Sequence, residues 1–301
     1  MIVSGRASQS LAAALAADLD EVLVSTKRTR FPDGEVRVDL DPGDGPGSAS
    51  DTEASIGDNA QQRALLVAAT TSADAFVELL QLQDALREAG VSEITTILPY
   101  MGYARQDRAF ESGQPVSARA MARAIGIGTD RVLLVNPHEE SVADFFDIPP
   151  RTIDAAPQLA EPLPDLNEPV FFAPDAGAIE LAEAVRGAYG AGTTDYFEKT
   201  RRSGEEIEIS PHETDAEGRD VVLVDDIVAT GGTMAETIAI LRQRDAARVY
   251  GTCVHPVLAN GAYTRLVNAG VEAIYGTDTV ERPASAVSVA PTIAEALRNP
   301  K

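Results

Sequence analysis

The fold of this chain is decided by the stretch Val221-Val-Leu-Val-Asp225-Asp226-Ile-Val-Ala229-Thr230-Gly231-Gly232-Thr233. Its apolar start is typical of a strand that is buried on both faces of a parallel sheet. Two carboxylates end the strand, a Gly-Gly pair predicts a turn, and the amphipathic pattern of Thr233–Arg244 predicts a helix. The stretch therefore predicts the strand-loop-helix unit of α/β proteins.

The loop of this unit carries two kinds of binding group. The backbone N–H groups of Gly231 and Gly232 precede a helix, where unpaired donors and the helix dipole attract a phosphate group. Asp225 and Asp226 suit sugar hydroxyls or a bound Mg²⁺, which prefers oxygen ligands. The alternative is a plain turn with solvent-facing acids and a capping Thr. Adjacent acids followed by Thr-Gly-Gly-Thr favour the phosphate site.

Apolar, β-rich runs alternate with amphipathic stretches along almost the whole chain. In Ala73–Ala89, for example, Phe76, Leu79 and Leu86 share one helical face and Gly90 predicts the end. Strands separated by helices form mainly parallel sheets covered by helices, so the predicted fold class is α/β. The expected strands are Val22–Val24, Val36–Asp39, Ala64–Ala68, Ile94–Leu98, Arg131–Val135, Val170–Ala173, Val221–Val224, Val249–Thr252 and Ala273–Tyr275. The other expected helices are Ser117–Ile125, Ala176–Ala188 and Gly261–Ala269.

Two stretches interrupt this alternation. Asp41–Ala60 is rich in Gly, Asp, Ser and Pro and predicts a solvated loop between two strands. Pro149–Pro169 contains six prolines and predicts a connector. We therefore expect two α/β domains, Met1–Ile148 and Pro149–Lys301, and we find no sequence repeat between them.

The composition of the 301 residues is strongly acidic: 25 basic and 47 acidic residues give a formal net charge of −22. Such a charge argues against general binding to nucleic acid or to an anionic membrane, which requires a basic surface. Lys occurs only at Lys27, Lys199 and Lys301. Excess acid with few lysines is typical of halophilic proteins, because a Debye length of about 3 Å at 1 M salt screens the repulsion. An ordinary acidic enzyme is the alternative.

The expected location is the cytoplasm. No apolar run approaches the roughly 20 residues of a membrane span, and Met1–Ser10 lacks the pattern of a signal peptide. The lone Cys253 has no second Cys with which to form an internal disulfide, which fits a reducing compartment.

Further segments connect the phosphate loop to a known family. They are Arg30-Phe31-Pro-Asp33-Gly34-Glu35, Pro99-Tyr-Met-Gly-Tyr-Ala-Arg105-Gln106-Asp107-Arg108, Asn136-Pro-His138, Phe145-Phe146-Asp147-Ile148-Pro149, Ala173-Pro174-Asp175-Ala-Gly177, Tyr196-Phe-Glu-Lys199-Thr-Arg201-Arg202 and Thr252-Cys-Val-His255-Pro-Val-Leu. Together with the Asp225–Thr233 loop they resemble the ribose-phosphate pyrophosphokinase (PRPP synthetase) family, from about Ser4 to Gly276. The resemblance implies two similar phosphoribosyltransferase-type domains, an N-terminal one for ATP and a C-terminal one for ribose phosphate. The active site is expected between them, at the carboxyl ends of the strands.

The resemblance also implies a role for each segment. The catalytic residues would be Lys199 and Arg201, two cations in a loop whose flank Ser203–Glu206 suits a mobile lid. Mg²⁺ would be held by His138 and Asp175, although Mg²⁺ by itself prefers oxygen to nitrogen. ATP would be bound by Phe31, Asp33, Glu35, Arg105, Gln106 and Asp107. Ribose 5-phosphate would be bound by Arg201, Asp225, Asp226, Ala229, Thr230, Gly231, Gly232 and Thr233.

Two positions depart from the family's pattern, and one loop implies an assembly. Asn136 and Ala229 each stand where many members have Asp. In the family the loop that corresponds to Phe31–Glu35 reaches the site of a neighbouring subunit, which implies a homo-oligomer, at least a dimer.

The implied reaction is ATP plus ribose 5-phosphate giving AMP plus PRPP. A phosphoribosyltransferase that consumes PRPP would explain Val221–Thr233 but would leave Arg105, Gln106 and Lys199–Arg201 unexplained. A non-catalytic regulatory paralogue that binds the same ligands is disfavoured, because the cations and the paired acids occur together.

Overall fold

The computed structural model describes residues 1–41, 63–203, 206–211 and 216–299, and it gives the backbone alone for 198–203 and 206–211. By its contacts the chain divides into two compact units. The first comprises Met1–Ile153 with Ala290–Lys301, and the second comprises Asp154–Val289.

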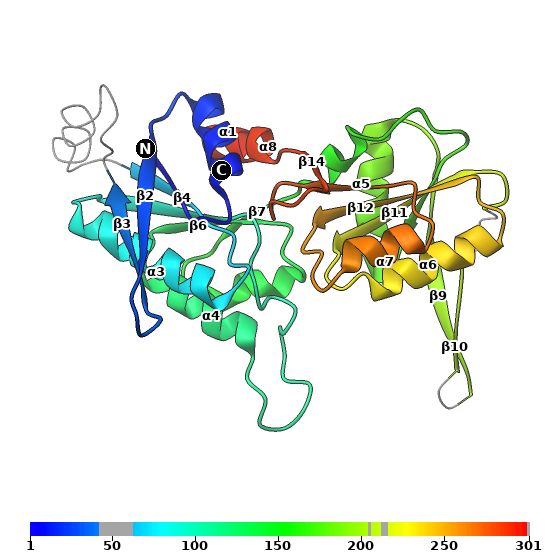
Figure 1. Cartoon of the computed structure of the whole chain (residues 1–301), viewed down its shortest axis with the longest axis horizontal. Helices are drawn as coiled ribbons and strands as arrows, with labels where there is room; N and C mark the ends of the chain where they lie inside the picture. The colour runs from blue at the N-terminus through cyan, green and yellow to red at the C-terminus, as the bar shows by residue number, and fades with distance from the viewer. Residues whose placement is uncertain (42–62, 204–205, 212–215, 300–301) are drawn as a thin grey trace. The chain divides into compact units, whose positions relative to one another are not determined.

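Among the described residues, the first unit contains a seven-stranded sheet in the order β3-β2-β1-β4-β5-β6-β7 (Figure 1). Neighbouring strands are parallel except for the antiparallel β2–β3 hairpin. The strands are β1 (Ile2–Ser4), β2 (Leu23–Arg30), β3 (Val36–Asp41), β4 (Arg63–Val67), β5 (Glu93–Leu98), β6 (Arg131–Val135) and β7 (Arg151–Ile153).

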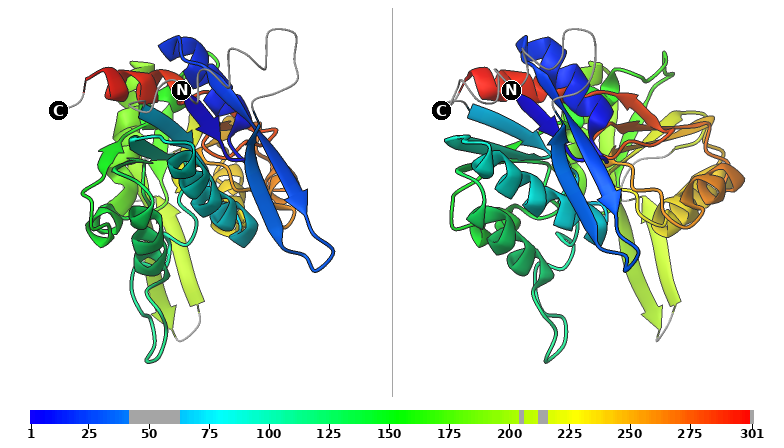
Figure 2. Two further views of the ribbon diagram at one scale, coloured as in Figure 1. Left: turned by 90° about the vertical axis from the view of Figure 1, so that its left-hand side faces the viewer. Right: turned by 60° about the vertical axis from the view of Figure 1, so that its left-hand side comes forward.

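Helices cover both faces of this sheet (Figures 1 and 2). One face carries α1 (Gln9–Leu19) and α8 (Ala290–Arg298), which pack on each other, and the other carries α3 (Ala73–Glu88) and α4 (Ser117–Ile127). On the α3 side, alternate strand residues such as Leu66 and Ile94 pack against Leu82 and Ile125 in one buried apolar cluster. Because helices cover both faces, the central strands are apolar without alternation, whereas the helices keep a period of 3.6 with one apolar face.

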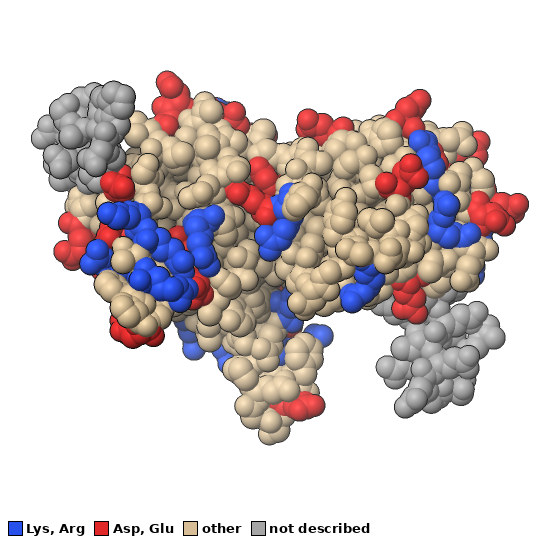
Figure 3. Space-filling model, viewed as in Figure 1, with Lys and Arg blue, Asp and Glu red and all other residues tan. Residues whose placement is uncertain are grey.

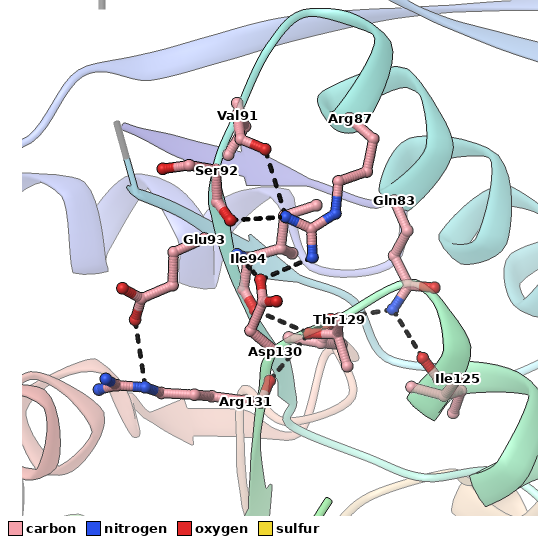
Figure 4. Close-up of polar contacts among 11 residues, drawn as sticks. Gln83, Arg87, Val91, Ser92, Glu93, Ile94, Ile125, Thr129, Asp130 and Arg131 are labelled. Carbon is pink, nitrogen blue, oxygen red and sulfur yellow. Dashed lines mark hydrogen bonds and ion pairs between the residues drawn. The ribbon is translucent and has the colours of Figure 1, made fainter. Parts of the chain in front are cut away.

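A polar network fixes the amino-terminal edge of the sheet (Figure 4). Asp130 Oδ2 accepts hydrogen bonds from Arg87 Nη2 and from the Ile94 N–H, each at 2.6 Å. Partial burial opposes ionisation of Asp130, but these donors outweigh it and hold its pKa below the usual range. Gln83 Nε2 adds bonds to Thr96 Oγ1 and to a carbonyl of α4. The carboxyl edge of the sheet, at the opposite end of the strands, carries the predicted site residues.

The second unit contains, in its described part, a seven-stranded sheet in the order β10-β9-β8-β11-β12-β13-β14. Here too the strands are parallel except for one hairpin, β9–β10. Helices α6 (Gly232–Gln243) and α7 (Ala262–Asn268) contact each other and contribute to one buried cluster, and α5 (Ile179–Tyr189) packs on β8, β9 and β11. The strands are β8 (Val170–Ala173), β9 (Thr193–Ser203), β10 (Glu206–Pro211), β11 (Asp220–Ile227), β12 (Arg248–His255), β13 (Ala273–Thr277) and β14 (Ser285–Val287).

The two units share one topology. In each unit a hairpin forms one edge of the sheet, and the unit's N-terminal strand (β1 or β8) pairs with that hairpin. The next strand in the sheet (β4 or β11) leads into the helix of a strand-loop-helix unit, α3 or α6. The β2–β3 hairpin thus corresponds to β9–β10, and the start of α3 corresponds to the start of α6. This equivalence confirms the predicted fold class of two similar, mainly parallel α/β domains, although no sequence repeat announces it.

Several elements differ from the sequence-based expectation. Pro149–Pro169 is not only a connector, because it contains β7 and the 3₁₀ helix Ala156–Ala160. By contacts the first unit ends at Ile153 rather than at Ile148, and it also includes α8. Arg151 explains this placement, since its guanidinium bonds the carbonyls of Ala296 and Asn299 at the end of α8. The expected loop Asp41–Ala60 lies, after Asp41, outside the described residues. No helix in the described part of the chain is long and apolar enough to cross a membrane.

Candidate active site

The predicted phosphate loop joins β11 to α6. Gly231 adopts the left-handed conformation (φ +68°) immediately before the helix and provides no side chain to cap it. The first N–H groups of α6 have no partner within the helix and are available to an anion. A Cβ on Gly231 would lie 3.3 Å from Leu266 Cγ, which is tight, so both conformation and space favour Gly here.

Contacts from the β12–α7 segment hold this loop in place. The N–H of Leu258 donates to the Val228 carbonyl, and the N–H of Ala259 donates to the Ala229 carbonyl, each at 2.9 Å. Arg265 of α7 donates to the Thr230 carbonyl. Arg265 is not predictable from the sequence, because a side chain that donates to a backbone carbonyl leaves no motif. Ala229 is held through its backbone carbonyl, so this contact does not depend on the side chain at position 229.

The paired acids lie at the carboxyl end of β11 and are half-buried. Asp225 Oδ1 accepts the Asp226 N–H at 2.9 Å, and Asp226 Oδ1 accepts the Ile227 N–H at 2.7 Å, which fixes both side chains relative to the strand. A small cavity beside them is lined by Phe197, Asp225 and Thr233, among others. Phe197 of β9, Asp225 of β11 and Thr233 of α6 therefore lie around one cavity within the second unit.

Asp175 follows β8, the strand that pairs with β11. It is exposed, and its Oδ1 accepts the Gly177 N–H at 3.1 Å at the start of a short 3₁₀ helix. Since β8 and β11 are parallel, Asp175 lies on the same edge of the sheet as Asp225 and Asp226. Among the described residues, no group of three or more His, Cys, Asp or Glu side chains is arranged to hold a metal ion.

The segment predicted to bind ATP follows β5 in the first unit. Its path depends on Gly102, whose N–H donates to Thr70 Oγ1 at 2.8 Å and where a Cβ would lie only 2.1 Å from the Thr70 carbonyl oxygen. Gln106 is half-buried and accepts a hydrogen bond from Ser117 Oγ at the start of α4, while Arg105 is exposed and Asp107 is half-buried. The loop thus presents Arg105 at the carboxyl edge of the sheet.

His138 follows β6, the strand next to β5, and is half-buried. It therefore lies on the same edge as Arg105. Asn136, the departure two residues earlier, has φ +35°, a positive φ that Asn tolerates better than most residues. Its N–H donates to the Ile153 carbonyl at 3.0 Å.

The Phe31–Glu35 loop forms the tip of the β2–β3 hairpin. It is closed by the N–H of Phe31 to the Glu35 carbonyl (2.8 Å) and by Asp33 Oδ1, which accepts the Glu35 N–H at 3.1 Å. Phe31 is 38% exposed, with the Arg37 guanidinium 5.7 Å from its ring centroid. Three strand spacings, about 14 Å, separate β2 from β5 in the sheet. The hairpin and the Arg105 segment thus adjoin strands that are not neighbours in the sheet.

Lys199 and Arg201 lie on β9, where their backbones pair with Ile209 and Ile207 of β10. The structure thus extends a hairpin through residues that the sequence analysis assigned to a loop; Gly204 and Glu205 lie outside the described residues. The alternation in Glu206–Ser210, with Ile at every second position, is the strand signal that could have predicted β10.

The uncapped start of α6, with paired acids at the carboxyl edge of a mainly parallel sheet, places this chain in the phosphoribosyltransferase-type class of α/β proteins. Residues 1–127 match the family model of the N-terminal domain of ribose phosphate pyrophosphokinase, and residues 144–275 match that of the phosphoribosyl transferase domain.

Comparisons with individual proteins agree over the whole length. The chain is 57% identical over 298 residues to the ribose-phosphate pyrophosphokinase of Halobacterium salinarum, covering 99% of this chain and 100% of that one. It is 44% identical over 298 residues to the enzyme of the same name from Methanosarcina mazei, covering 98% and 94%. The crystal structure of phosphoribosylpyrophosphate synthetase from Mycobacterium smegmatis matches with a TM-score of 0.80 and 28% identity, over 99% of this chain and 97% of that one. The chain belongs to the ribose-phosphate pyrophosphokinase family, which confirms the resemblance found in the sequence.

Proposed function

We propose that this enzyme transfers the diphosphate group of ATP to the anomeric hydroxyl of ribose 5-phosphate, giving AMP and PRPP. The observation that carries the proposal is the uncapped start of α6 at Gly231 beside Asp225 and Asp226. It occurs in a chain that is similar to pyrophosphokinases over its whole length.

Each substrate is assigned to one edge of a sheet. The N–H groups of Gly231, Gly232 and Thr233 bind the 5-phosphate, and Asp225 and Asp226 accept hydrogen bonds from the ribose hydroxyls. In the first unit Arg105 binds the polyphosphate of ATP, because its planar fork matches phosphate oxygens, and Gln106 and Asp107 assist it.

The reaction is an in-line displacement at the β-phosphorus of ATP. The 1-hydroxyl oxygen of ribose 5-phosphate forms a bond to this phosphorus, and the bond from the same phosphorus to the oxygen that bridges to the α-phosphate breaks. AMP leaves with that electron pair, and the hydroxyl proton is lost. Lys199 and Arg201 stabilise the charge that develops on the transferred group, since positioning and cations supply most of the catalysis in such transfers.

Mg²⁺ is the proposed metal, and the proposed ligands are His138 in the first unit and Asp175 in the second. Asp175 offers the oxygen ligand that Mg²⁺ prefers, and Mg²⁺ commonly keeps several waters and binds one or two carboxylates together with substrate phosphates. The ion would neutralise phosphate charge and orient the diphosphate group.

The proposed assembly is a cytoplasmic homo-oligomer without nucleic-acid or membrane partners. Phe31, Asp33 and Glu35 would contact the adenine bound by a neighbouring subunit, which is supported by the exposure of Phe31 and by the distance of its hairpin from β5. Mixing subunits with Phe31→Ala and subunits with Lys199→Ala should restore part of the activity. No restoration after demonstrated subunit exchange would contradict a loop that acts on a neighbour.

An assay for AMP release tests the reaction itself. We expect AMP from ATP only when ribose 5-phosphate is present, and a strong loss of this AMP in Asp225→Asn. A phosphoribosyltransferase would instead consume PRPP with a base, and a regulatory paralogue would do neither.

A further inference from the structure

The start of α3 in the first unit corresponds to the start of α6 in the second, but the two helix starts are capped differently. In the second unit the corresponding helix start, at Gly231, has no side-chain cap. In the first unit Ser72 caps α3 by accepting the Ala75 N–H at 3.2 Å, and Asp74 places a carboxylate in the first turn. A carboxylate is stabilised there by the helix dipole. The chain's own acid thus stands where the second unit offers an anion site.

Asp74 binds the β2–β3 hairpin through arginines. Its Oδ2 accepts hydrogen bonds from Arg28 Nη2 at 2.9 Å and from Arg30 Nη2 at 2.5 Å, two residues on the same face of β2. Arg6 Nη2 lies 4.0 Å from the same oxygen. Figure 3 shows Lys and Arg side chains gathered over this hairpin, on a chain whose formal net charge is −22.

The charge state of Asp74 suits this contact. Desolvation opposes its ionisation, but the guanidinium groups of Arg30 and Arg28 outweigh that effect and hold its pKa below the usual range. The carboxylate is therefore ionised at neutral pH. A single charged oxygen is shared by two arginines of one strand.

Arg30 continues the connection to the tip of the hairpin. Its Nη1 donates to the Gly34 carbonyl at 2.9 Å while its Nη2 binds Asp74. The Phe31–Glu35 loop is thereby linked to α3 through one guanidinium. On the other strand, Gln81 of α3 binds the backbone of Val36 and Val38 at 2.7 and 2.9 Å. Helix α3 thus contacts both strands of the hairpin, and the Asp74 contact is the one next to the tip.

We propose that Asp74, acting through Arg30, is a positioning residue that holds the Phe31–Glu35 loop in the conformation that binds the nucleotide. The inference rests on the proposed contact of this loop with adenine. The pairing of β2 with β1 ends at Val24, and beyond it the hairpin is two-stranded. A two-stranded hairpin is only marginally stable by itself, so its tip needs a tertiary contact to be ordered. A loop that is ordered before binding avoids the entropy cost of ordering on binding, and this saving increases affinity.

The test compares Asp74→Asn with Asp130→Asn. Both substitutions remove the charge of an Asp that is paired with Arg in the first unit and has a side-chain exposure of 42%. Asp74 follows the carboxyl end of β4, whereas Asp130 precedes β6 at the opposite edge of the sheet. We expect Asp74→Asn to raise the KM and the Kd for ATP about three- to tenfold, the range of one or two partly exposed ion pairs. The kcat and the KM for ribose 5-phosphate should stay within about twofold. Asp130→Asn should leave all of these constants unchanged, and Asp74→Glu should restore ATP binding in part.

A double-mutant cycle shows whether Asp74 acts through Arg30. The effects of Asp74→Asn and Arg30→Ala on the Kd for ATP should be less than additive, because both break the same link. Additive effects, or equal ATP binding in Asp74→Asn and the wild type, would overturn the proposal. Phe31→Ala separates this failure from failure of the proposed function. If Phe31→Ala weakens ATP binding and Asp74→Asn does not, only the positioning role is wrong; if neither does, the loop itself has been misassigned.

Discussion

Replacing Gly231 by Ala tests the phosphate loop at the position where its backbone is most constrained. The left-handed conformation, φ +68°, costs a residue with a Cβ about 1–2 kcal/mol. The new Cβ would also lie 3.3 Å from Leu266 Cγ and 3.4 Å from Ala262 Cβ, so α7 must shift by a few tenths of an ångström. At about 2–4 °C per kcal/mol, the conformational cost alone predicts a fall of about 2–8 °C in melting temperature.

Gly232→Ala is the matched control. Gly232 is the first residue of α6, and the nearest atom to a Cβ there is Thr230 Oγ1 at 3.9 Å. Replacing Gly by Ala in a helix is favourable by up to about 1 kcal/mol, so the melting temperature should stay unchanged or rise. The open space beside Gly232 is where we place the 5-phosphate, so the methyl group should obstruct the ligand rather than the fold.

Thermal unfolding and steady-state kinetics together measure both effects. We expect both variants to raise the KM for ribose 5-phosphate about tenfold or more, the cost of about one charge-assisted hydrogen bond, with little change in the KM for ATP. Only Gly231→Ala should lower the melting temperature. A Gly231→Ala enzyme with normal stability and a normal KM for ribose 5-phosphate would refute the assignment of this loop.

Further predictions concern catalysis, salt, acid and the ATP segment. Lys199→Ala should lower kcat by about 10²–10³ while both KM values change only a few-fold, and a near-normal kcat would remove Lys199 from the mechanism. Transfer to about 0.1 M salt, where the Debye length is about 10 Å, should lower the melting temperature of a chain of charge −22; a higher value there would contradict halophilic adaptation. Desolvation opposes ionisation of Asp220, but the Arg248 guanidinium at 2.5 Å outweighs this effect and lowers the Asp220 pKa. The pair therefore stabilises the fold above about pH 4, and this stabilisation is lost as the pH falls and Asp220 becomes protonated. Asp220→Asn should therefore flatten the acid side of the curve of stability against pH, whereas a parallel curve would show that the pair contributes nothing. Gly102→Ala should lower the melting temperature and weaken ATP binding, because its Cβ would lie 2.1 Å from the Thr70 oxygen; unchanged values of both would mean that this segment can shift freely.

The sequence predicted the interior of both sheets well, for a physical reason. Strands such as Arg131–Val135 and Val170–Ala173 are buried on both faces, so their apolar runs are continuous and their bounds agree with the structure. The three-residue strands β1, β7 and β14 are too short to carry a periodic signal. Helix α8 follows the second unit in sequence but packs on α1, and no local pattern can predict such a long-range contact.

In the candidate site, too, some residues can be predicted from the sequence and others cannot. Motifs identify groups that a ligand would touch, such as Asp225 and Arg105, because their chemistry recurs at fixed spacing. The residues that hold those groups act across long sequence separations. Arg265 bonds a carbonyl 35 residues away, and Arg30 binds Asp74 across 44 residues. Neither contact depends on a local sequence pattern, so only the structure could reveal them.

The most direct test of the proposed reaction follows the phosphate groups of ATP separately. The enzyme is incubated with ribose 5-phosphate, Mg²⁺ and ATP labelled with ³²P either at the α- or at the γ-phosphate, and the products are separated by chromatography. Attack at the β-phosphorus predicts that the γ label is recovered in PRPP and the α label in AMP, in equal amounts. Recovery of the α label in ADP, with the γ label in a ribose bisphosphate, would show transfer of a single phosphoryl group and would contradict the account.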